Sequence, residues 1–181
     1  MCPGAAYRGR FVICYHGGPG STWHSVHIVI EVNERVEVAS PPRVVWDLLS
    51  DPHAVVECVP GASLGERHED GSYDAVLTVK FGPAKVTFRV RFTLELDDAG
   101  MTGKVVSRGR DNQGGTRVKA NMTFRVVDGA APGSAAVPID AQVEIGGKLA
   151  SLVESGANLV VKRMTKEFSE RLAAKVAGAT A

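Results

Sequence analysis

The sequence predicts an α+β fold in which a curved, seven-stranded antiparallel sheet wraps around one long C-terminal helix, with two short helices after the first strand. Apolar residues recur at every fourth position between Gly146 and Val176, which is the period of one buried helical face. Before Gly146, the chain consists mainly of short segments in which apolar and polar residues alternate, as in half-buried strands. The last helix, roughly 40 Å long at about 1.5 Å per residue, is the one predicted helix long enough to cover such a sheet.

Composition limits the classes of function. The 181 residues suffice for one domain, and the 44% hydrophobic and 23% charged content is ordinary for a globular protein. A net charge of +1 and an aromatic content of 6% argue against a nucleic-acid partner. No apolar run approaches the roughly 20 residues of a membrane span. Cys2, Cys14 and Cys58 form no CxxC pair and no even set, which favours a reducing compartment. We therefore expect a cytoplasmic protein, at most peripheral to the membrane, without a cofactor.

Residues 1–25 differ from the rest of the chain. They are dense in glycine and proline and show neither a strand period nor a helix period. We expect this stretch to be disordered, or to be a misassigned extension with Val26 or Val29 as the true start. Residues 26–178 are predicted to form the single ordered domain.

The ordered domain is predicted to begin with a strand and two short helices. Apolar and polar residues alternate from Val26 to Val38. Ser40-Pro41-Pro42 is typical of a helix start, with the serine hydroxyl as the cap and the prolines in the first turn. This helix ends at Asp51-Pro52, and a second short helix is expected from His53 to Val59.

Six further strands are expected to follow as a meander. Asp70-Gly71 is a strong hairpin signal, and Gly82-Pro83 turns the chain again. The clearest strand follows that turn, where perfect alternation predicts one dry and one wet face. After a strand that precedes Asp70, the predicted strands are Tyr73–Phe81, Ala84–Leu96, Met101–Gly109, Val118–Val126 and Val137–Ile145.

The long helix is predicted to carry one apolar ridge. Gly146-Gly147 lets the chain turn into the helix, and Gly178 is a stop signal. Three further apolar residues, Leu149, Val153 and Leu159, are expected to flank the ridge. The ridge itself consists of Leu152, Gly156, Val160, Met164, Phe168, Leu172 and Val176.

Small residues are predicted to face one another between the sheet and the long helix. In a solid core small residues face large ones, so this pattern predicts an apolar void that holds an apolar ligand. The alternative is that Phe and Met side chains fill the void. The small residues are Gly103, Val105, Ser107, Gly109, Ala120, Gly156 and Ala157. The expected ligand-binding residues, with no catalytic or metal-binding residue among them, are Trp46, Phe81, Phe88, Phe92, Met101, Gly103, Val105, Ala120, Met122, Phe124, Leu152, Gly156 and Val160.

Several local motifs occur in a fixed order along residues 29–172. The most specific is VEIGGKLASL at Val143–Leu152, directly after the last predicted strand. The shorter pieces are Pro41–Trp46, Asp51-Pro52, Val59-Pro60-Gly61 and Phe81-Gly82-Pro83. Together they resemble the family of the carbon monoxide dehydrogenase G subunit, within the START-like (SRPBCC) superfamily, whose members have a helix-grip fold.

The resemblance implies a non-catalytic accessory protein of a carbon monoxide dehydrogenase-type molybdenum hydroxylase. Such a protein would bind a lipid- or quinone-like molecule in an internal cavity and link the enzyme to the membrane. Many members carry a hydrophobic C-terminal anchor, and this sequence ends at Ala181 without one, so we expect at most transient membrane contact. One alternative is a ligand-free assembly chaperone. Another is a START-like cyclase or hydrolase whose polar cavity residues would be Ser107, Asn121, Thr123 and Tyr73.

Other motifs are better explained without a catalytic site. The HGGPG stretch at 16–20 and the GASLG stretch at 61–65 match hydrolase motifs, but Ser63 follows a helix and no acid and histidine are suitably placed downstream. Asp51, His53, Glu57 and Cys58 lack the spacing of a metal site, and Cys58 is expected to be a small, half-buried apolar residue. The basic residues on the central strand, Lys85, Arg89 and Arg91, are typical of a solvated face; the alternative is a docking site for an acidic partner or for lipid headgroups.

Overall fold

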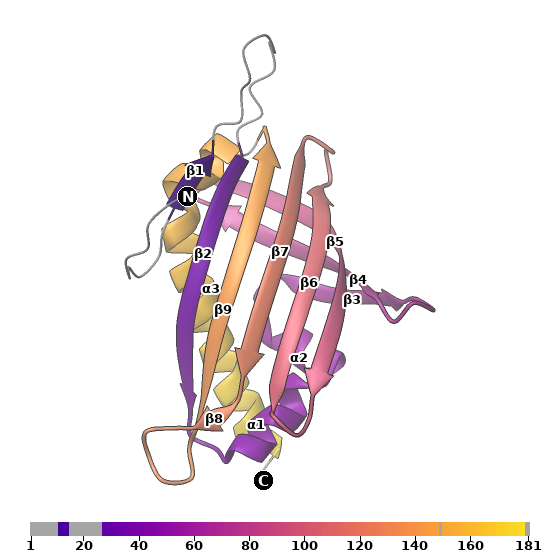
Figure 1. The fold of residues 1–181 in the computed structure, drawn as a ribbon. Helices are drawn as coiled ribbons and strands as arrows, with labels where there is room; N and C mark the ends of the chain where they lie inside the picture. The colour runs from indigo at the N-terminus through magenta and orange to yellow at the C-terminus, as the bar shows by residue number, and fades with distance from the viewer. Residues whose placement is uncertain (1–10, 15–26, 149, 180–181) are drawn as a thin grey trace.

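The computed structural model describes residues 11–14, 27–148 and 150–179 of the chain. Within these ranges, three helices accompany nine strands (Figure 1). The helices are α1 (Pro42–Leu49), α2 (Pro52–Cys58) and α3 (Ala150–Ala179). The strands are β1 (Phe11–Cys14), β2 (His27–Val38), β3 (Ala62–Arg67), β4 (Tyr73–Phe81), β5 (Ala84–Asp97), β6 (Thr102–Asp111), β7 (Thr116–Arg125), β8 (Val127–Asp128) and β9 (Ala135–Gly147).

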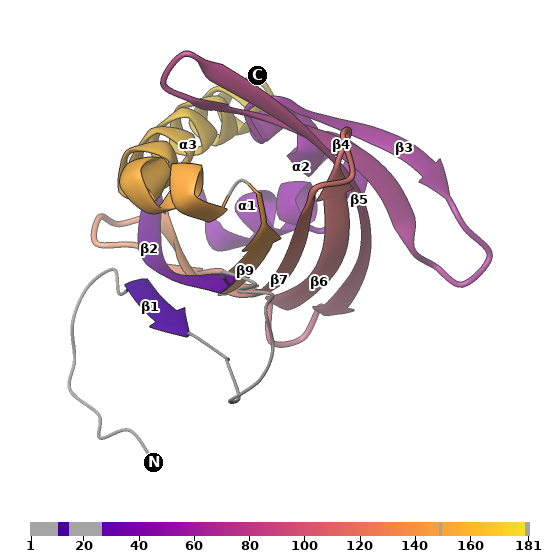
Figure 2. The same cartoon turned by 90° about the horizontal axis from the view of Figure 1, so that it is seen from above.

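The strands form a single antiparallel sheet in the order β1-β2-β9-β7-β6-β5-β4-β3, with β8 paired to β9. The sheet curves, and the helices lie on its concave side, as the view from above shows (Figure 2). Helix α3 contacts β2 and β4, which lie towards opposite edges of the sheet, and α1 and α2 pack near its C-terminal end. This arrangement confirms the predicted fold, because one long helix is gripped by a curved sheet.

All seven predicted strands are present, and the structure adds two short ones. Strand β8 is a two-residue extension beside β9. Strand β1 pairs with β2 from Phe11 to Cys14, inside the stretch for which disorder was predicted. The other residues of that stretch, including the HGGPG motif at 16–20, lie outside the described residues.

Alternation along β5 explains why this segment forms a central strand. Val86 and Phe88 are buried on the concave face, whereas Lys85 and Arg89 are exposed on the convex face. The alternation persists across the sheet because the pairing between β5, β6, β7 and β9 contains no register shift.

The starts of the two short helices differ. Asp51 caps α2, since its Oδ1 accepts a hydrogen bond from the His53 backbone N–H at 2.9 Å. At α1, the expected serine cap is wrong. The N-cap is Pro41, no side chain caps the helix, and the buried Ser40 Oγ has no hydrogen-bond partner among the described residues. A hydroxyl buried without a partner costs stability.

Replacing Ser40 by alanine is therefore expected to raise the free energy of unfolding by about 1 kcal/mol, because the unsatisfied hydroxyl is removed. Urea unfolding of the two proteins measures the change. Ser50→Ala is the control, since the Ser50 hydroxyl donates to the Asp47 carbonyl at 3.2 Å and its loss should not stabilise the protein. A lower unfolding free energy for Ser40→Ala would contradict this account.

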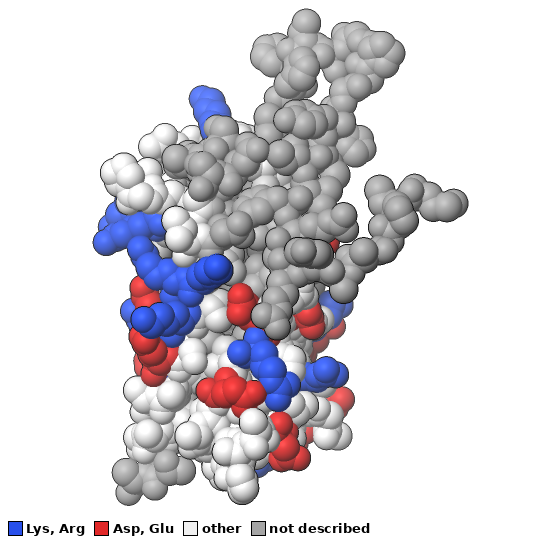
Figure 3. All heavy atoms as spheres, turned by 90° about the vertical axis from the view of Figure 1, so that its left-hand side faces the viewer, with Lys and Arg blue, Asp and Glu red and all other residues white. Residues whose placement is uncertain are grey.

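Helix α3 buries the C-terminal half of its predicted ridge most completely. Leu172 and Val176 are buried, whereas Val160, Met164 and Phe168 are half-buried. The expectation that Leu159 packs beside the ridge is wrong, because its side chain is 75% exposed. On the side of the molecule formed by α3 and β2, positive and negative side chains are interspersed (Figure 3). Along α3, Arg163 and Glu167 form an ion pair at 3.2 Å. Within the described parts of the chain, none of the helices combines the length and the apolar character needed to cross a bilayer.

Candidate functional site

The strand register places four apolar side chains and one serine, from five strands, in one row across the concave face. Phe92 of β5 lies opposite Ser107 of β6, and Ser107 lies opposite Ala120 of β7. Ala120 in turn pairs with Val143 of β9, which pairs with Ile30 of β2. The next row towards α1 contains Leu94, Val105, Met122, Ala141 and Val32.

Two separate core clusters lie on either side of Phe92, Ser107 and Ala120, whereas Val143 and Ile30 at the other end of the row pack in the second cluster. The first core cluster joins α1, α2 and the C-terminal end of α3 to the sheet, and the second joins strands β2, β4, β5 and β9 near Val160, Val161 and Met164 of α3. The buried members of the first cluster are Val36, Val38, Val45, Trp46, Leu48, Leu49, Cys58, Phe124, Val126, Ala135, Val137, Leu172 and Val176. Those of the second cluster are Ile28, Ile30, Val79, Phe81, Val86, Phe88 and Ile145.

Between the clusters, the concave face retains accessible apolar surface. Phe92, Ala120 and Ala141 are only half-buried and pack against neither cluster, although all three face the helix side of the sheet. Phe92 instead stacks on Tyr73, with ring centroids 5.4 Å apart. Apolar side chains in a filled core are normally fully buried. The middle of the concave face is therefore our candidate binding site.

The predicted ligand-binding residues fall into three groups. Phe92 and Ala120 lie between the clusters, in the candidate site, and Leu152 belongs to a part of α3 whose side chains are not described. Phe81, Phe88 and Val160 belong to the second cluster, and Gly156 faces Phe81. The residues at the first cluster are Trp46, Met101, Gly103, Val105, Met122 and Phe124.

The expectation that small residues face small residues is wrong at Gly103. A Cβ atom at this position would lie 2.2 Å from Cζ of Phe124, so the ring of Phe124 covers the glycine directly. Gly109 is also closely packed, because a Cβ there would lie 2.6 Å from the Arg89 carbonyl oxygen. At Gly156, in contrast, the nearest atom to an added Cβ is the Phe81 Cδ1 at 3.7 Å. An added Cβ would therefore make an ordinary van der Waals contact at Gly156, whereas at Gly103 and Gly109 it would clash.

Trp46 closes the α1 end of the concave face. Its ring is buried 6.2 Å from that of Phe124, and its Nε1–H donates to Asp98 Oδ1 at 2.7 Å. Arg43 donates to Asp98 Oδ2 at 3.1 Å. The hydrogen bond from Arg43, and then that from Trp46, lower the pKa of Asp98 below its usual value. Asp98 thus fixes α1 to the β5–β6 turn.

This pairing predicts a pH-dependent contribution to stability. Because the pKa of Asp98 is lower in the folded chain, the unfolded chain takes up the proton first as the pH falls. The stability that wild type has over Asp98→Asn should therefore be present at neutral pH and disappear as the pH falls below about 4. Urea unfolding across this range measures the difference. A difference that stays constant with pH would contradict the ionic contribution of Asp98.

Glu34 is a concave-face residue that the sequence reasoning missed. Strand β2 pairs with β9 without a shift, so Glu34 shares the face of Val32 and Val36 and lies opposite Ile139. Its side chain is half-buried, and no hydrogen bond or ion pair with another described residue involves it. Its position in the alternation Val32–Glu34–Val36 is the signal that identifies it.

The four polar residues offered for a catalytic site do not share one face. Ser107 and Tyr73 belong to the concave face, whereas Asn121 and Thr123 alternate with Ala120 and Met122 and face the convex side. There they line a shallow hollow of about 290 Å³. A second convex hollow, of about 450 Å³, includes Glu95, Lys104 and Asp140. Both hollows are on the face opposite the candidate site.

The other motifs are accounted for by local structure. Ser63 lies within β3 rather than at a strand-to-helix turn, so the GASLG stretch does not have the geometry of a nucleophile elbow. Glu57 forms an ion pair with Lys175 of α3. Cys58 is fully buried rather than half-buried, and this burial raises the pKa of its thiol. Among the described residues, no group of three or more His, Cys, Asp or Glu side chains could hold a metal ion.

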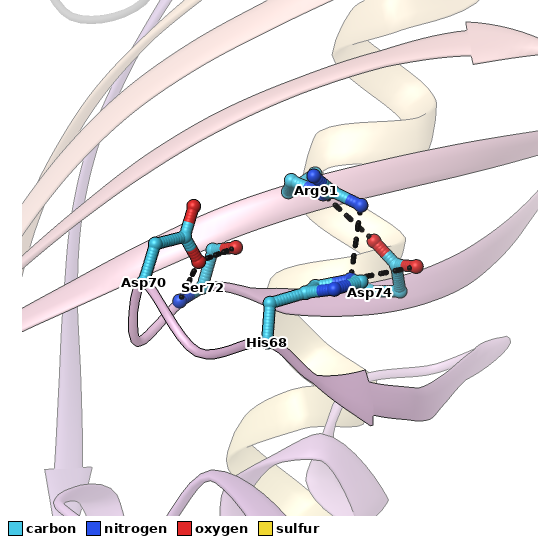
Figure 4. Close-up of polar contacts among 5 residues, drawn as sticks. All are labelled: His68, Asp70, Ser72, Asp74 and Arg91. Atoms are coloured by element: carbon cyan, nitrogen blue, oxygen red, sulfur yellow. Dashed lines mark hydrogen bonds and ion pairs between the residues drawn. The ribbon is translucent and has the colours of Figure 1, made fainter.

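A polar cluster lies at the β3–β4 hairpin, on the convex side (Figure 4). His68 Nε2 lies 3.0 Å from Asp74 Oδ2 and 2.9 Å from Arg91 Nη2, and Arg91 Nε lies 3.0 Å from Asp74 Oδ1. One ring nitrogen can donate to the carboxylate or accept from the guanidinium, but not both. Hydrogen bonds from Arg91 and then His68 lower the pKa of Asp74. These contacts fix the hairpin to β5.

Comparisons with known proteins give one family and one fold. The family model for the G subunit of carbon monoxide dehydrogenase (CoxG) matches residues 35–177. None of the curated proteins matches the sequence.

Solved structures match over most of the chain, at sequence identities that show the fold alone. A conserved protein from Geobacillus kaustophilus has a TM-score of 0.71 at 21% identity, covering 82% of this chain and 96% of its own. The ZhuI aromatase/cyclase from Streptomyces sp. R1128 has a TM-score of 0.58 at 16% identity, covering 84% and 96%. A norcoclaurine synthase mutant from Thalictrum flavum, in complex with a transition-state analogue, has a TM-score of 0.53 at 19% identity, covering 88% and 100%.

Proposed function

The chain belongs to the family of the carbon monoxide dehydrogenase G subunit (CoxG), and we propose that it is a non-catalytic carrier of an apolar, lipid- or quinone-like molecule. In this proposal the ligand occupies the space between the middle of the concave face and α3. The carrier serves as an accessory factor of a molybdenum hydroxylase of the carbon monoxide dehydrogenase type and makes transient contact with the membrane.

One observation carries the proposal. Phe92, Ala120 and Ala141 present half-buried apolar surface on the concave face, between two core clusters that pack without them. Covering this surface with an apolar molecule would gain roughly 25 cal/mol for each Å² removed from water. The START-like fold is a hydrophobic-ligand-binding fold, which supports the same reading.

The choice of a quinone rests on the chemistry of the proposed partner. A soluble dehydrogenase must pass its electrons to an acceptor, and quinone acceptors reside in the membrane. A soluble carrier that holds the quinone in an apolar site would bridge that separation. The same site chemistry accommodates a fatty acyl chain, so the test uses one probe of each kind.

Isothermal titration calorimetry of the full chain with decylubiquinone and, separately, with oleic acid tests the proposal. We expect one molecule to bind per chain, with a dissociation constant of about 10 µM or tighter for at least one probe. A ligand-free assembly chaperone would bind a molybdenum hydroxylase but neither probe. If neither probe gives a heat of binding, the result would contradict the proposed carrier function.

A START-like enzyme is the second candidate, and Glu34 is the observation that favours it. Glu34 places a carboxylate on the concave face, where it could act as an acid or base towards a bound molecule. Mass spectrometry of each probe before and after incubation separates the two functions. A carrier returns the probe unchanged, whereas an enzyme acting on it yields a product whose formation is lost in Glu34→Gln.

A further inference from the structure

Six basic side chains gather on the convex face of three adjacent strands. The register aligns Arg89 of β5, Arg110 of β6 and Arg117 of β7 in one row across the sheet. The neighbouring row aligns one residue from each of the same strands, and all six side chains are exposed. These residues, which we call the basic surface, are Arg89, Arg91, Arg108, Arg110, Arg117 and Lys119.

Few acidic groups balance the basic surface. Arg91 pairs with Asp74, and Glu144 is aligned beside Lys119 at the edge of the group. For the other five basic side chains, no ion pair or side-chain hydrogen bond with a described residue is found. The chain as a whole has 21 Lys and Arg against 20 Asp and Glu, so this surface is a local concentration rather than part of a basic protein. The side formed by α3 and β2, in contrast, intersperses the two signs (Figure 3).

Repulsion between these like charges lowers the stability of the sheet when no partner is bound. Residues directly opposite on neighbouring strands have Cβ atoms about 5 Å apart, and like charges in such pairs are destabilising. Arg110 has an arginine opposite it on both sides, and Arg108 has Arg91 and Lys119. An oppositely charged partner would remove this repulsion.

We propose that the basic surface docks an acidic protein surface, rich in aspartate and glutamate. Five of the six residues are arginine, whose planar fork binds a carboxylate with two parallel hydrogen bonds. The inference is independent of the ligand proposed for the concave face, because the two surfaces are on opposite sides of the sheet.

The surroundings of the basic surface favour a protein over a bilayer or a nucleic acid. The exposed large apolar residues of the described chain are Val76, Leu96 and Leu159, and of these only Val76 borders the surface, opposite Arg89. Membrane binding by a surface site normally adds apolar insertion to charge. The sheet is convex here (Figure 2), so a flat bilayer would meet only part of the surface at once. No aromatic side chain occupies a convex position of β5, β6 or β7 for stacking on bases.

The experiment measures fluorescence anisotropy of a labelled poly-glutamate peptide with the full chain, in about 0.1 M NaCl, where the Debye length is about 10 Å. Wild type should bind, and Arg108→Glu combined with Arg110→Glu should weaken binding by at least about ten-fold. Lys162→Glu combined with Lys166→Glu, the same charge change on α3, is the matched control and should change affinity by less than about two-fold. Absence of peptide binding, or equal weakening by both double variants, would overturn the proposal.

Two further measurements keep the result interpretable. Urea unfolding of the Arg108/Arg110 variant should show a midpoint at or above that of wild type, because opposite charges then face each other. If that variant fails to fold, the single variant Arg110→Gln replaces it, with a smaller loss of peptide affinity expected.

Co-sedimentation with vesicles of phosphatidylcholine and phosphatidylglycerol in equal parts should not depend on Arg108 and Arg110. If vesicle binding is stronger than peptide binding and is lost in the variant, the basic surface binds lipid headgroups. That result would overturn the proposal of an acidic protein partner.

Discussion

Replacing Ala120 by phenylalanine is expected to weaken binding of decylubiquinone by at least about ten-fold, or 1.4 kcal/mol. Ala120 lies in the middle of the concave face, is half-buried and packs against neither core cluster. A benzyl side chain at this position would take the volume that the ligand needs. Isothermal titration calorimetry of both proteins measures the loss.

Asn121→Phe is the matched control for this substitution. It adds the same ring one residue further along β7, where the side chain lies on the convex face, and should leave decylubiquinone affinity unchanged. The unfolding free energy supplies a second readout. If the site is open, the new ring should change the unfolding free energy little. If the site is a filled core, the ring should lower the unfolding free energy by about 1–3 kcal/mol. Equal affinities of the two variants, or a stability loss of that size for Ala120→Phe alone, would contradict the site.

Replacing Gly103 by alanine is expected to lower the unfolding free energy by about 3 kcal/mol, at the upper end of the range for overpacking. The added methyl group would meet the Phe124 ring at about 2.2 Å, and Phe124 is held by Trp46 in the first core cluster. The Phe124 ring would have to shift against Trp46, at the α1 end of the molecule. Urea unfolding gives the free energy.

The double variant Gly103→Ala with Phe124→Leu identifies the cause. If the ring is what the methyl group meets, the double variant should be more stable than the sum of the two single changes predicts. Gly178→Ala, at a glycine outside the left-handed region with no atom near an added Cβ, controls for loss of glycine itself and should not lower the unfolding free energy. A Gly103→Ala protein as stable as wild type would show that the ring does not cover this residue.

Most of the fold could be predicted because alternation and helical period are local signals. Strand β5 alternates without exception, and the ridge of α3 repeats every fourth residue, so both were predicted from spacing alone. The error at the start of α1 has a different origin. Ser40-Pro41-Pro42 is a common capping pattern, but whether the hydroxyl reaches an N–H depends on the backbone angles, and the structure uses Pro41 as the cap.

The candidate site could be predicted only in part, because composition does not reveal what lies opposite a small residue. Gly103 and Ala120 are both small and both on the concave face. Phe124 covers the glycine, whereas Ala120 packs against neither core cluster. The basic surface was predicted only in part, for a related reason. Arg89 and Arg91 were noticed on their own strand, but the charges of β6 and β7 join them only through the strand register, which single-strand patterns do not specify.

Native mass spectrometry of the purified chain, followed by organic extraction, tests the binding of an apolar molecule most directly. The carrier account predicts a species heavier than the bare chain by one apolar molecule, either as purified or after incubation with decylubiquinone. That molecule should be recovered unchanged in the extract, and the Ala120→Phe protein should appear bare. A wild-type chain that appears bare under both conditions would contradict the account.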